Sequence, residues 1–201
     1  LQAVTDDIIA SGGQAQAYVA DLSNTDEIDG LSERILKDHP AIDVLFNNAG
    51  IGAYGIQELM SPEDMTRVFD VNVTGVQRIM RAALPHFRAQ GRGTILYTSS
   101  LIGRIATPFY GTYSASKWAL EAMVECYRTE LSDFGIESCI IEPGAMPTAF
   151  FDGMVTPQDP MRETEYGDFA VVPALSAQAL AQEQALGLTQ ELKLVRVLVL
   201  V

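Results

Sequence analysis

Residues 42–50 read Ile42-Asp43-Val44-Leu45-Phe46-Asn47-Asn48-Ala49-Gly50, a compact apolar run that ends in small and polar residues. Pro40 marks a turn before the run, which is typical of a short buried strand. Ligands of open α/β sheets bind beyond the carboxyl ends of strands, so the Asn/Gly turn lies where a ligand is expected. Its two amides could also hold neighbouring loops together. Because Asn and Gly dominate turns that bind nothing, this turn alone leaves both interpretations open.

The chain before this strand alternates between helical and extended patterns. Apolar residues at helical spacing predict a helix over residues 1–11, and a short strand is expected at Ala15–Ala20. Ser23 or Asn24 can cap a second helix that runs to about Asp38. Such alternation predicts the α/β class, with a doubly wound, mostly parallel sheet of the Rossmann type and helices on both of its faces.

The alternation continues after the strand. Ser61-Pro62-Glu63-Asp64 is a strong helix start, and this helix is expected to reach Gln90 with a bend or interruption at Pro85. Further strands are expected at Thr94–Thr98 and Glu137–Glu142. The first ends in Ser99-Ser100 at its carboxyl end, and Pro143-Gly144 ends the second sharply.

A tyrosine and a lysine four residues apart open the last expected helix, which runs to about Phe134. Tyr113 and Lys117 would lie one above the other on one helical face. A phenol titrates near pH 10, and a nearby ammonium would lower that pKa enough for proton exchange with a substrate oxygen. A solvated helix face carries the same spacing. Asn72 lies inside the preceding expected helix. If it has a role at the site, it is expected to distort that helix and point inward. If it has none, its amide is expected to form a local hydrogen bond or to face water.

Composition restricts the function classes. The 201 residues carry a formal net charge of −13, with 48% hydrophobic and 19% charged residues, which describes an ordinary globular chain. The acidic balance argues against nucleic acid or an anionic membrane as a partner. Cys126 and Cys139 have no metal-ligand spacing, so no metal is expected, and both are predicted to be small buried side chains in a reducing compartment. A cytoplasmic location without a signal peptide is expected, and the apolar run 194–201 is either a buried strand or a tail outside the fold.

Taken together, the strand ends and the two helices resemble the short-chain dehydrogenase/reductase family, in its short single-domain branch. The order and spacing of the matching residues over positions 1 to about 150 carry the resemblance, although each motif alone is weak. The matching residues are Asp21-Leu22, Asn47 to Gly50, Asn72, Ser100 thirteen residues before Tyr113, Lys117, and Pro143-Gly144 followed by Thr148.

The resemblance implies an oxidoreductase that transfers a hydride between NAD or NADP and an alcohol or ketone. Tyr113 would be the acid/base, and Ser100 would orient the substrate oxygen. Lys117 would bond the nicotinamide ribose and depress the pKa of the tyrosine, while Asn72 would hold a water that relays protons. The cofactor-binding residues would run from the adenine to the nicotinamide amide: Asp21, Leu22, Asn48, Ala49, Gly50, Tyr113, Lys117, Pro143, Gly144, Met146 and Thr148.

The resemblance is incomplete at both ends of the chain. The family's glycine-rich phosphate loop and first two strands would precede Leu1, so an N-terminally incomplete protein is expected. Residues 1–153 are then an incomplete Rossmann-like domain, and residues 154–201 are the substrate lid and an atypical C-terminal helix and strand of the same domain. Three alternatives stay open: an inactive fragment, a non-catalytic dinucleotide-binding or scaffold protein, and an epimerase or dehydratase of the extended branch.

Substrate and assembly are indicated only in outline. Apolar side chains flank the expected site and favour an apolar alcohol or ketone, although such walls are usual for any small-molecule site; they are Phe109, Phe150, Phe151 and Met154. The helices near 62–90 and 113–134 carry more apolar residues than one face needs. A homodimer or homotetramer through these helices is therefore expected, as is common in the family.

Overall fold

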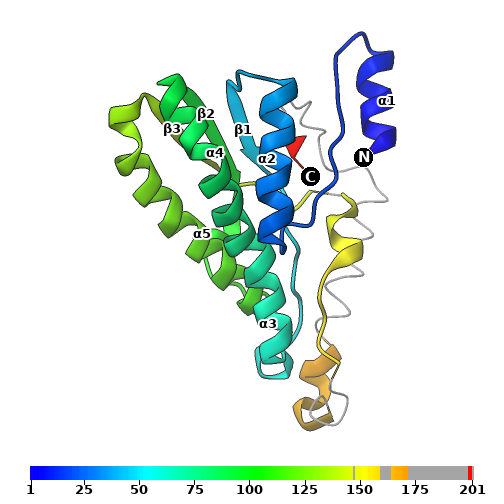
Figure 1. The fold of residues 1–201 in the computed structure, drawn as a ribbon. Coiled ribbons are helices and arrows are strands. Elements are labelled where there is room, and N and C mark those ends of the chain that lie inside the picture. Colours follow the sequence, from blue (N-terminus) through cyan, green and yellow to red (C-terminus); the bar gives the residue numbers. More distant parts are fainter. Residues whose placement is uncertain (147, 159–163, 172–198, 201) are drawn as a thin grey trace.

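The computed structural model describes residues 1–146, 148–158, 164–171 and 199–200. Its centre is a four-stranded sheet in the order β3-β2-β1-β4, in which each neighbouring pair is parallel (Figure 1). The parallel α/β class predicted from the sequence is confirmed. The strands are β1 (Val44–Asn47), β2 (Gly93–Thr98), β3 (Ile136–Ile141) and β4 (Val199–Leu200).

Helices connect the strands, and α2 and α3 begin at side-chain caps. The side chain of Asn24 accepts hydrogen bonds from two amides of α2, and that of Ser61 accepts one from α3, which are ways to satisfy the free N–H groups of a first turn. The α-helices are α1 (Gln2–Ala10), α2 (Thr25–Asp38), α3 (Pro62–Phe69), α4 (Val76–Gln90) and α5 (Gly111–Glu130). Short 3₁₀ segments lie at Gln57–Leu59, Leu101–Gly103, Ser132–Phe134, Ala149–Gly153 and Thr164–Val171.

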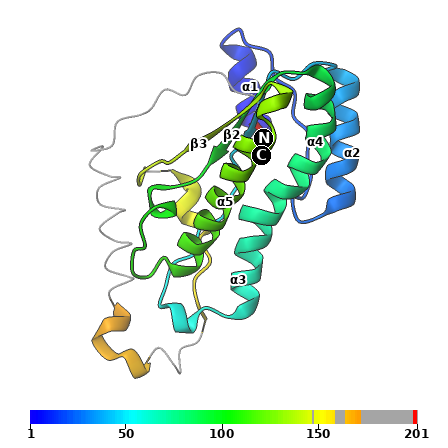
Figure 2. The same cartoon turned by 90° about the vertical axis from the view of Figure 1, so that its left-hand side faces the viewer.

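Three of the helices, α2, α4 and α5, lie side by side on one face of the sheet (Figures 1 and 2). The main core lies between them and the strands, where Leu45, Ile95 and Tyr97 of the sheet meet the apolar faces of the helices. By contrast, α1 forms as predicted but buries no side chain. Among the described residues, no helix combines the length and the apolar character that crossing a membrane requires.

The two cysteines are exposed, so the prediction that they are buried is wrong. Side chains alternate between the two faces of a strand, and in β3 Ile136 and Ser138 are buried while Cys139 is on the other face. Cys126 lies on the solvent side of α5. The spacing of apolar residues along α5 and β3 could not show which face of each element is packed against the rest of the protein.

The strand expected at Ala15–Ala20 does not form, and this prediction is also wrong. The segment lies instead along α2, where Tyr18 Oη donates to Asp38 and Arg34 donates to the carbonyl of Val19. A strand needs a partner for its backbone groups, and β1 already pairs with β2 on one side and β4 on the other.

The apolar run at the end of the chain forms a strand at Val199–Leu200, in register with Phe46 and Asn47 of β1. The rest of that run lies outside the described residues. So do residues 147, 159–163 and 172–198, which include most of the segment assigned to the lid and the C-terminal helix.

The long helix expected over 62–90 is interrupted, but at a different place from the one predicted. A π-helical segment, Asp70–Gly75, separates α3 from α4, whereas Pro85 lies inside α4, which runs on through it. One extra residue per turn displaces the side chain of Asn72 from the ordinary helical position. Such insertions are frequent at functional sites.

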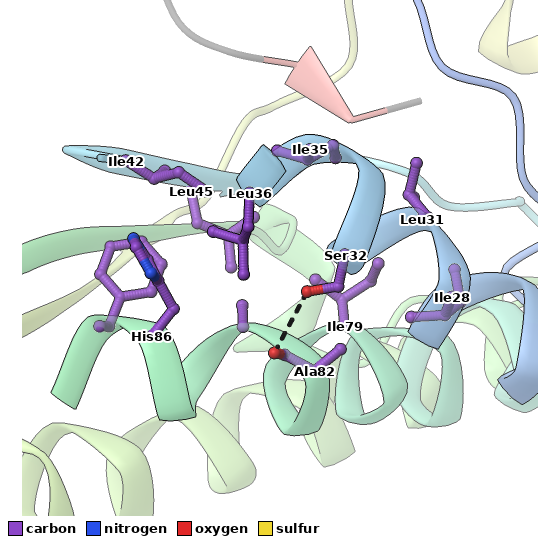
Figure 3. A pocket seen from close by; sticks show the side chains of 12 residues that line it. Ile28, Leu31, Ser32, Ile35, Leu36, Ile42, Leu45, Ile79, Ala82 and His86 are labelled. Atoms are coloured by element: carbon purple, nitrogen blue, oxygen red, sulfur yellow. Dashed lines mark hydrogen bonds between the residues drawn. The ribbon is translucent and has the colours of Figure 1, made fainter. Parts of the chain in front are cut away.

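An apolar cavity of about 40 Å³ lies between α2, β1 and α4 (Figure 3). Aliphatic side chains from α2 and α4 line it, and Ser32 Oγ donates to the carbonyl of Ala82 at 3.3 Å at its edge. None of the side chains that line this cavity belongs to the residues predicted to act on a substrate or cofactor. The candidate site is therefore a different part of the molecule.

Candidate functional site

The loops that follow β1, β2 and β3 are held together at one edge of the sheet. Thr98 Oγ1 donates to Asn48 Oδ1 at 2.9 Å, which is the kind of loop-to-loop bond expected of the Asn/Gly turn. The amide of Ser99 donates to the carbonyl of Ile141 at 2.8 Å, and that of Leu101 donates to the carbonyl of Pro143 at 3.0 Å. These bonds fix the position of Ser100, which lies between Ser99 and Leu101.

Asn72 points inward from the π-helical segment and is 1% exposed. Its Oδ1 accepts from the amide of Ile51 at 2.8 Å, and its Nδ2 donates to the carbonyl of Ile51 at 2.9 Å. The same Nδ2 donates to Ser116 Oγ at 3.0 Å, and Ser116 in turn donates to the carbonyl of Tyr113. This network excludes the interpretation of Asn72 as a water-facing amide and ties the turn after β1 to α5.

Tyr113 lies in the first turns of α5 with 7% of its surface exposed. Burial disfavours the phenolate and raises the pKa of Tyr113 to about 12, while a hydrogen bond with the Ser100 side chain acts in the opposite direction. The expected lowering of this pKa is therefore wrong for this structure, because desolvation of the phenol outweighs its polar contact. At neutral pH the phenol keeps its proton and can donate it.

Lys117 lies one helical turn after Tyr113 and is 3% exposed. Its Nζ donates to the carbonyl of Thr98 at 2.7 Å and lies 5.6 Å from the centre of the Tyr113 ring. Burial lowers the pKa of Lys117 to about 8, and the carboxylate of Glu121 acts to raise it. The amine is thus fixed between the end of β2 and the candidate acid/base.

Part of the predicted cofactor set surrounds a hollow at the end of β1. Leu22 and Ala49 line it together with Asn47 and Val76. The backbone of Gly50 lies close to the site: a Cβ there would be 3.2 Å from Asn72 Oδ1 and 3.5 Å from Lys117 Nζ. A small residue is therefore needed at this approach.

These groups suit two separate parts of a dinucleotide. The exposed carboxylate of Asp21 accepts from the amide and the hydroxyl of Ser23, which holds it at the rim near Leu22, where it could accept from an adenine amine. The ammonium of Lys117 could donate to ribose hydroxyls. The residues present thus fit the adenosine and the nicotinamide ribose of NAD or NADP.

The predicted residues after β3 are less well gathered. Pro143 is part-buried and its carbonyl accepts from the amide of Leu101, Met146 is part-buried, and Gly144 and Thr148 are exposed. A neighbouring side chain does reach the site: the ring centres of Phe150 and Tyr113 are 5.6 Å apart. This segment is held by a bridge between Ala53 and Val155.

Aromatic side chains form one wall beside Tyr113. The ring centres of Tyr54 and Tyr110 are 4.6 Å apart, and Phe109 lies 6.2 Å from Tyr54 with a left-handed backbone, φ 70°. Phe109 and Phe150 were expected at the site from the sequence, but Tyr54 and Tyr110 were not. Tyr54 lies four residues after Gly50 and Tyr110 lies three residues before Tyr113. This closeness in sequence to predicted site residues could have indicated that both tyrosines are at the site.

Two further polar residues at the site were missed from the sequence. Glu121 is 3% exposed and Ser99 is 2% exposed, and Ser99 Oγ donates to Glu121 Oε1 at 2.5 Å. The signal for Glu121 was an acidic residue four positions after Lys117, on the same helical face. Within the described ranges, no group of three or more metal-binding side chains occurs.

Comparison with known proteins agrees with this geometry. The family model for short chain dehydrogenases matches residues 1–159. The chain therefore belongs to the short-chain dehydrogenase/reductase family.

Curated relatives cover most of this chain but are themselves longer. A 3-ketodihydrosphingosine reductase of Bacteroides thetaiotaomicron is 33% identical over 156 residues, which are 78% of this chain and 58% of that protein. Human 17-beta-hydroxysteroid dehydrogenase type 1 is 32% identical over 158 residues, covering 78% of this chain and 48% of the enzyme. The chain thus spans about half the length of the curated relatives that it matches.

Solved structures show the same fold with cofactors bound. A short-chain dehydrogenase/reductase from Burkholderia phymatum in complex with NAD has a TM-score of 0.77 and 27% identity, covering 92% of this chain and 66% of that chain. A gluconate 5-dehydrogenase from Burkholderia cenocepacia in complex with NADP and tartrate has a TM-score of 0.70 and 25% identity, covering 74% of this chain and 58% of that chain. Both cofactors thus occur among its structural neighbours.

Proposed function

We propose that the protein is an oxidoreductase that reduces a ketone or oxidises an alcohol with NAD or NADP, and that Tyr113 is its acid/base. One observation carries the proposal: the Tyr113 phenol shares a hydrogen bond with Ser100 and its ring lies 5.6 Å from the buried amine of Lys117. All three side chains lie at the carboxyl ends of the strands, where open parallel sheets bind their ligands.

The residues would divide the work as follows. Bound nicotinamide would supply the hydride, and the protein would supply alignment and the proton. Ser100 would hold the substrate oxygen beside Tyr113. In the reduction direction the Tyr113 phenol gives its proton to that oxygen, and in oxidation the phenolate takes the proton from the alcohol. Lys117 would bond the ribose hydroxyls, and Asn72 would hold a water that returns the proton.

The cofactor would lie across the strand ends. Its adenosine would lie over the hollow at Leu22 and Ala49 with Asp21 at the rim, its central part along Asn48 to Gly50, and its nicotinamide amide under the loop after β3. That loop would contribute Pro143, Gly144, Met146 and Thr148. The hollow and the close approach at Gly50 support this path.

An apolar substrate is favoured by the aromatic wall beside Tyr113. Phe150 and Tyr110 flank the acid/base, and the buried ring of Tyr54 extends the same surface. Relatives named for a hydroxysteroid and for 3-ketodihydrosphingosine are in keeping with an apolar alcohol or ketone.

Turnover and binding must be measured separately to test the proposal. The full-length protein is titrated with NADH and NADPH by intrinsic fluorescence and then assayed for oxidation of the cofactor with a panel of apolar and polar ketones. Binding with turnover on apolar ketones is expected. Binding without turnover on any carbonyl would instead favour a non-catalytic dinucleotide-binding or scaffold role.

Assembly as a homodimer or homotetramer through the helices near 62–90 and 113–134 forms part of the proposal. Large apolar side chains are exposed on these segments and support it: Met65 on α3, Trp118 on α5 and Phe134 just after α5. Light scattering of the full-length protein is expected to give a dimer or tetramer. A stable monomer at micromolar concentration would contradict this part.

A further inference from the structure

Glu121 is a buried carboxylate whose charge the proposed reaction does not use. It lies four residues after Lys117 on α5 and is 3% exposed. A carboxylate is rarely buried unless it is paired or hydrogen-bonded, because the loss of hydration is costly. The contacts of Glu121 therefore indicate its role in the structure.

One oxygen of Glu121 is bonded to the loop that carries Ser100. Ser99 Oγ donates to Glu121 Oε1 at 2.5 Å, and Ser99 immediately precedes Ser100. Gly103, at the other end of this short loop, has no room for a side chain: a Cβ there would be 2.3 Å from Glu121 Oε1 and 2.5 Å from Ser99 Oγ. The loop is thus packed directly against the carboxylate.

The other oxygen of Glu121 is buried without a hydrogen bond. Arg104 Nε lies 2.5 Å from Glu121 Oε2, but its single proton is directed to Glu142 Oε1 at 2.9 Å, so Oε2 receives no hydrogen bond. Arg104 is half-exposed, so its charge is partly in contact with solvent. The field of the buried carboxylate therefore acts on the nearby amine of Lys117, whose pKa it raises against the lowering by burial.

We infer that Glu121 is a positioning residue that fixes the Ser100 loop against α5 through Ser99 and places a buried negative charge one helical turn from Lys117. The inference rests on the proposed function in one respect, since it assigns Glu121 to the support of Ser100 and Lys117. It does not depend on which ketone or alcohol is the substrate.

The charge part of the inference is specific because few ionisable groups surround Lys117. From its own helix these are Tyr113 and Glu121, and Arg104 of the loop after β2 reaches the same carboxylate. Gly50 of the turn after β1 and Asn72 of the π-helical segment, which lie close to the amine, are uncharged. Neutralising Glu121 therefore removes the negative charge one helical turn from the amine.

The two parts can be separated with two substitutions. Glu121→Gln keeps an acceptor for Ser99 and removes only the charge. Ser99→Ala keeps the charge and removes only the hydrogen bond. Glu130→Gln is the matched control, because Glu130 is an exposed acidic residue at the end of the same helix α5.

Lysine ε-carbon NMR of the full-length protein measures the charge part without cofactor or turnover, with the resonance assigned by its loss in Lys117→Met. Glu121→Gln is expected to lower the pKa of Lys117 by about one pH unit, since a unit charge one turn away is removed from a desolvated site. Ser99→Ala and Glu130→Gln are expected to leave the pKa of Lys117 unchanged. An unchanged pKa in Glu121→Gln would overturn this part.

Amide hydrogen exchange over residues 100–103 measures the loop part. Ser99→Ala is expected to raise exchange there by about tenfold, and Glu121→Gln to raise it far less. Equal exchange in Ser99→Ala and the original protein would overturn this part. If both measurements succeed but no ketone is reduced, the proposed function fails and the support of Lys117 by Glu121 stands.

Discussion

Replacing Asn72 tests whether the π-helical segment is held by this one side chain. In Asn72→Ala the amide and the carbonyl of Ile51 both lose their partner, and Ser116 loses a donor while keeping its own bond to Tyr113. Two backbone groups are thus left unpaired at Ile51, which is part-buried. Each such group costs about 1–3 kcal/mol, or about 2–6 kcal/mol for the pair, and because Ile51 is partly exposed a loss of about 2–4 kcal/mol in the free energy of unfolding is expected.

Urea denaturation followed by circular dichroism measures this loss directly. A fall of about 3 kcal/mol corresponds to a drop in melting temperature of roughly 6–12 °C for a domain of this size. Thr74→Ala is the matched control, because Thr74 is an exposed residue of the same segment. It is expected to change the stability by less than about 0.5 kcal/mol. If Asn72→Ala were no more destabilising than Thr74→Ala, the assigned network would be wrong.

Two other predictions concern the residues around the site. Gly103→Ala is expected to destabilise the protein by about 1–3 kcal/mol in urea, because its Cβ would overlap Glu121 and Ser99, whereas Gly30→Ala, in open space on α2, should stabilise it by up to about 1 kcal/mol. The pKa of Lys117 is about 8 when folded and 10.5 ordinarily, so the unfolded chain binds more protons between these values. Stability relative to Lys117→Met should therefore rise with pH from about 8 to 10.5, while affinity for NADH falls as the ammonium is lost. No relative rise in stability would contradict the buried position of the amine.

Features set by neighbours in the sequence could be predicted from it. The caps at Asn24 and Ser61 and the strand at Thr94–Thr98 depend on local backbone groups and on short apolar patterns, and they are found where the sequence places them. The distortion at Asn72 could be anticipated because an amide inside an apolar helical pattern is unusual.

Features set by distant parts of the chain could not be predicted. Ala15–Ala20 has the composition of a strand, but whether it pairs depends on which segment lies beside β1. The exposure of Cys139 depends on which face of β3 the helices cover. The raised pKa of Tyr113 depends on how deeply its ring is buried, which a spacing of four residues to Lys117 does not show.

The interior contacts of Glu121 also could not be predicted from the sequence. An acidic residue at helical spacing from a lysine usually forms an exposed pair. Here the loop after β2 folds over the carboxylate, and Gly103 permits the close approach. Only the three-dimensional arrangement distinguishes a supporting residue from a surface charge.

Loss of the Tyr113 hydroxyl tests the central claim most directly. In the full-length protein, Tyr113→Phe is expected to lower turnover of a ketone by about 100-fold or more, because only proton transfer is removed. Its affinity for NADH or NADPH should stay within about threefold. Tyr127→Phe, on the same helix but bonded to Gln77, is the control and should keep its activity. If Tyr113→Phe retained more than about a tenth of the turnover, Tyr113 would not be the acid/base.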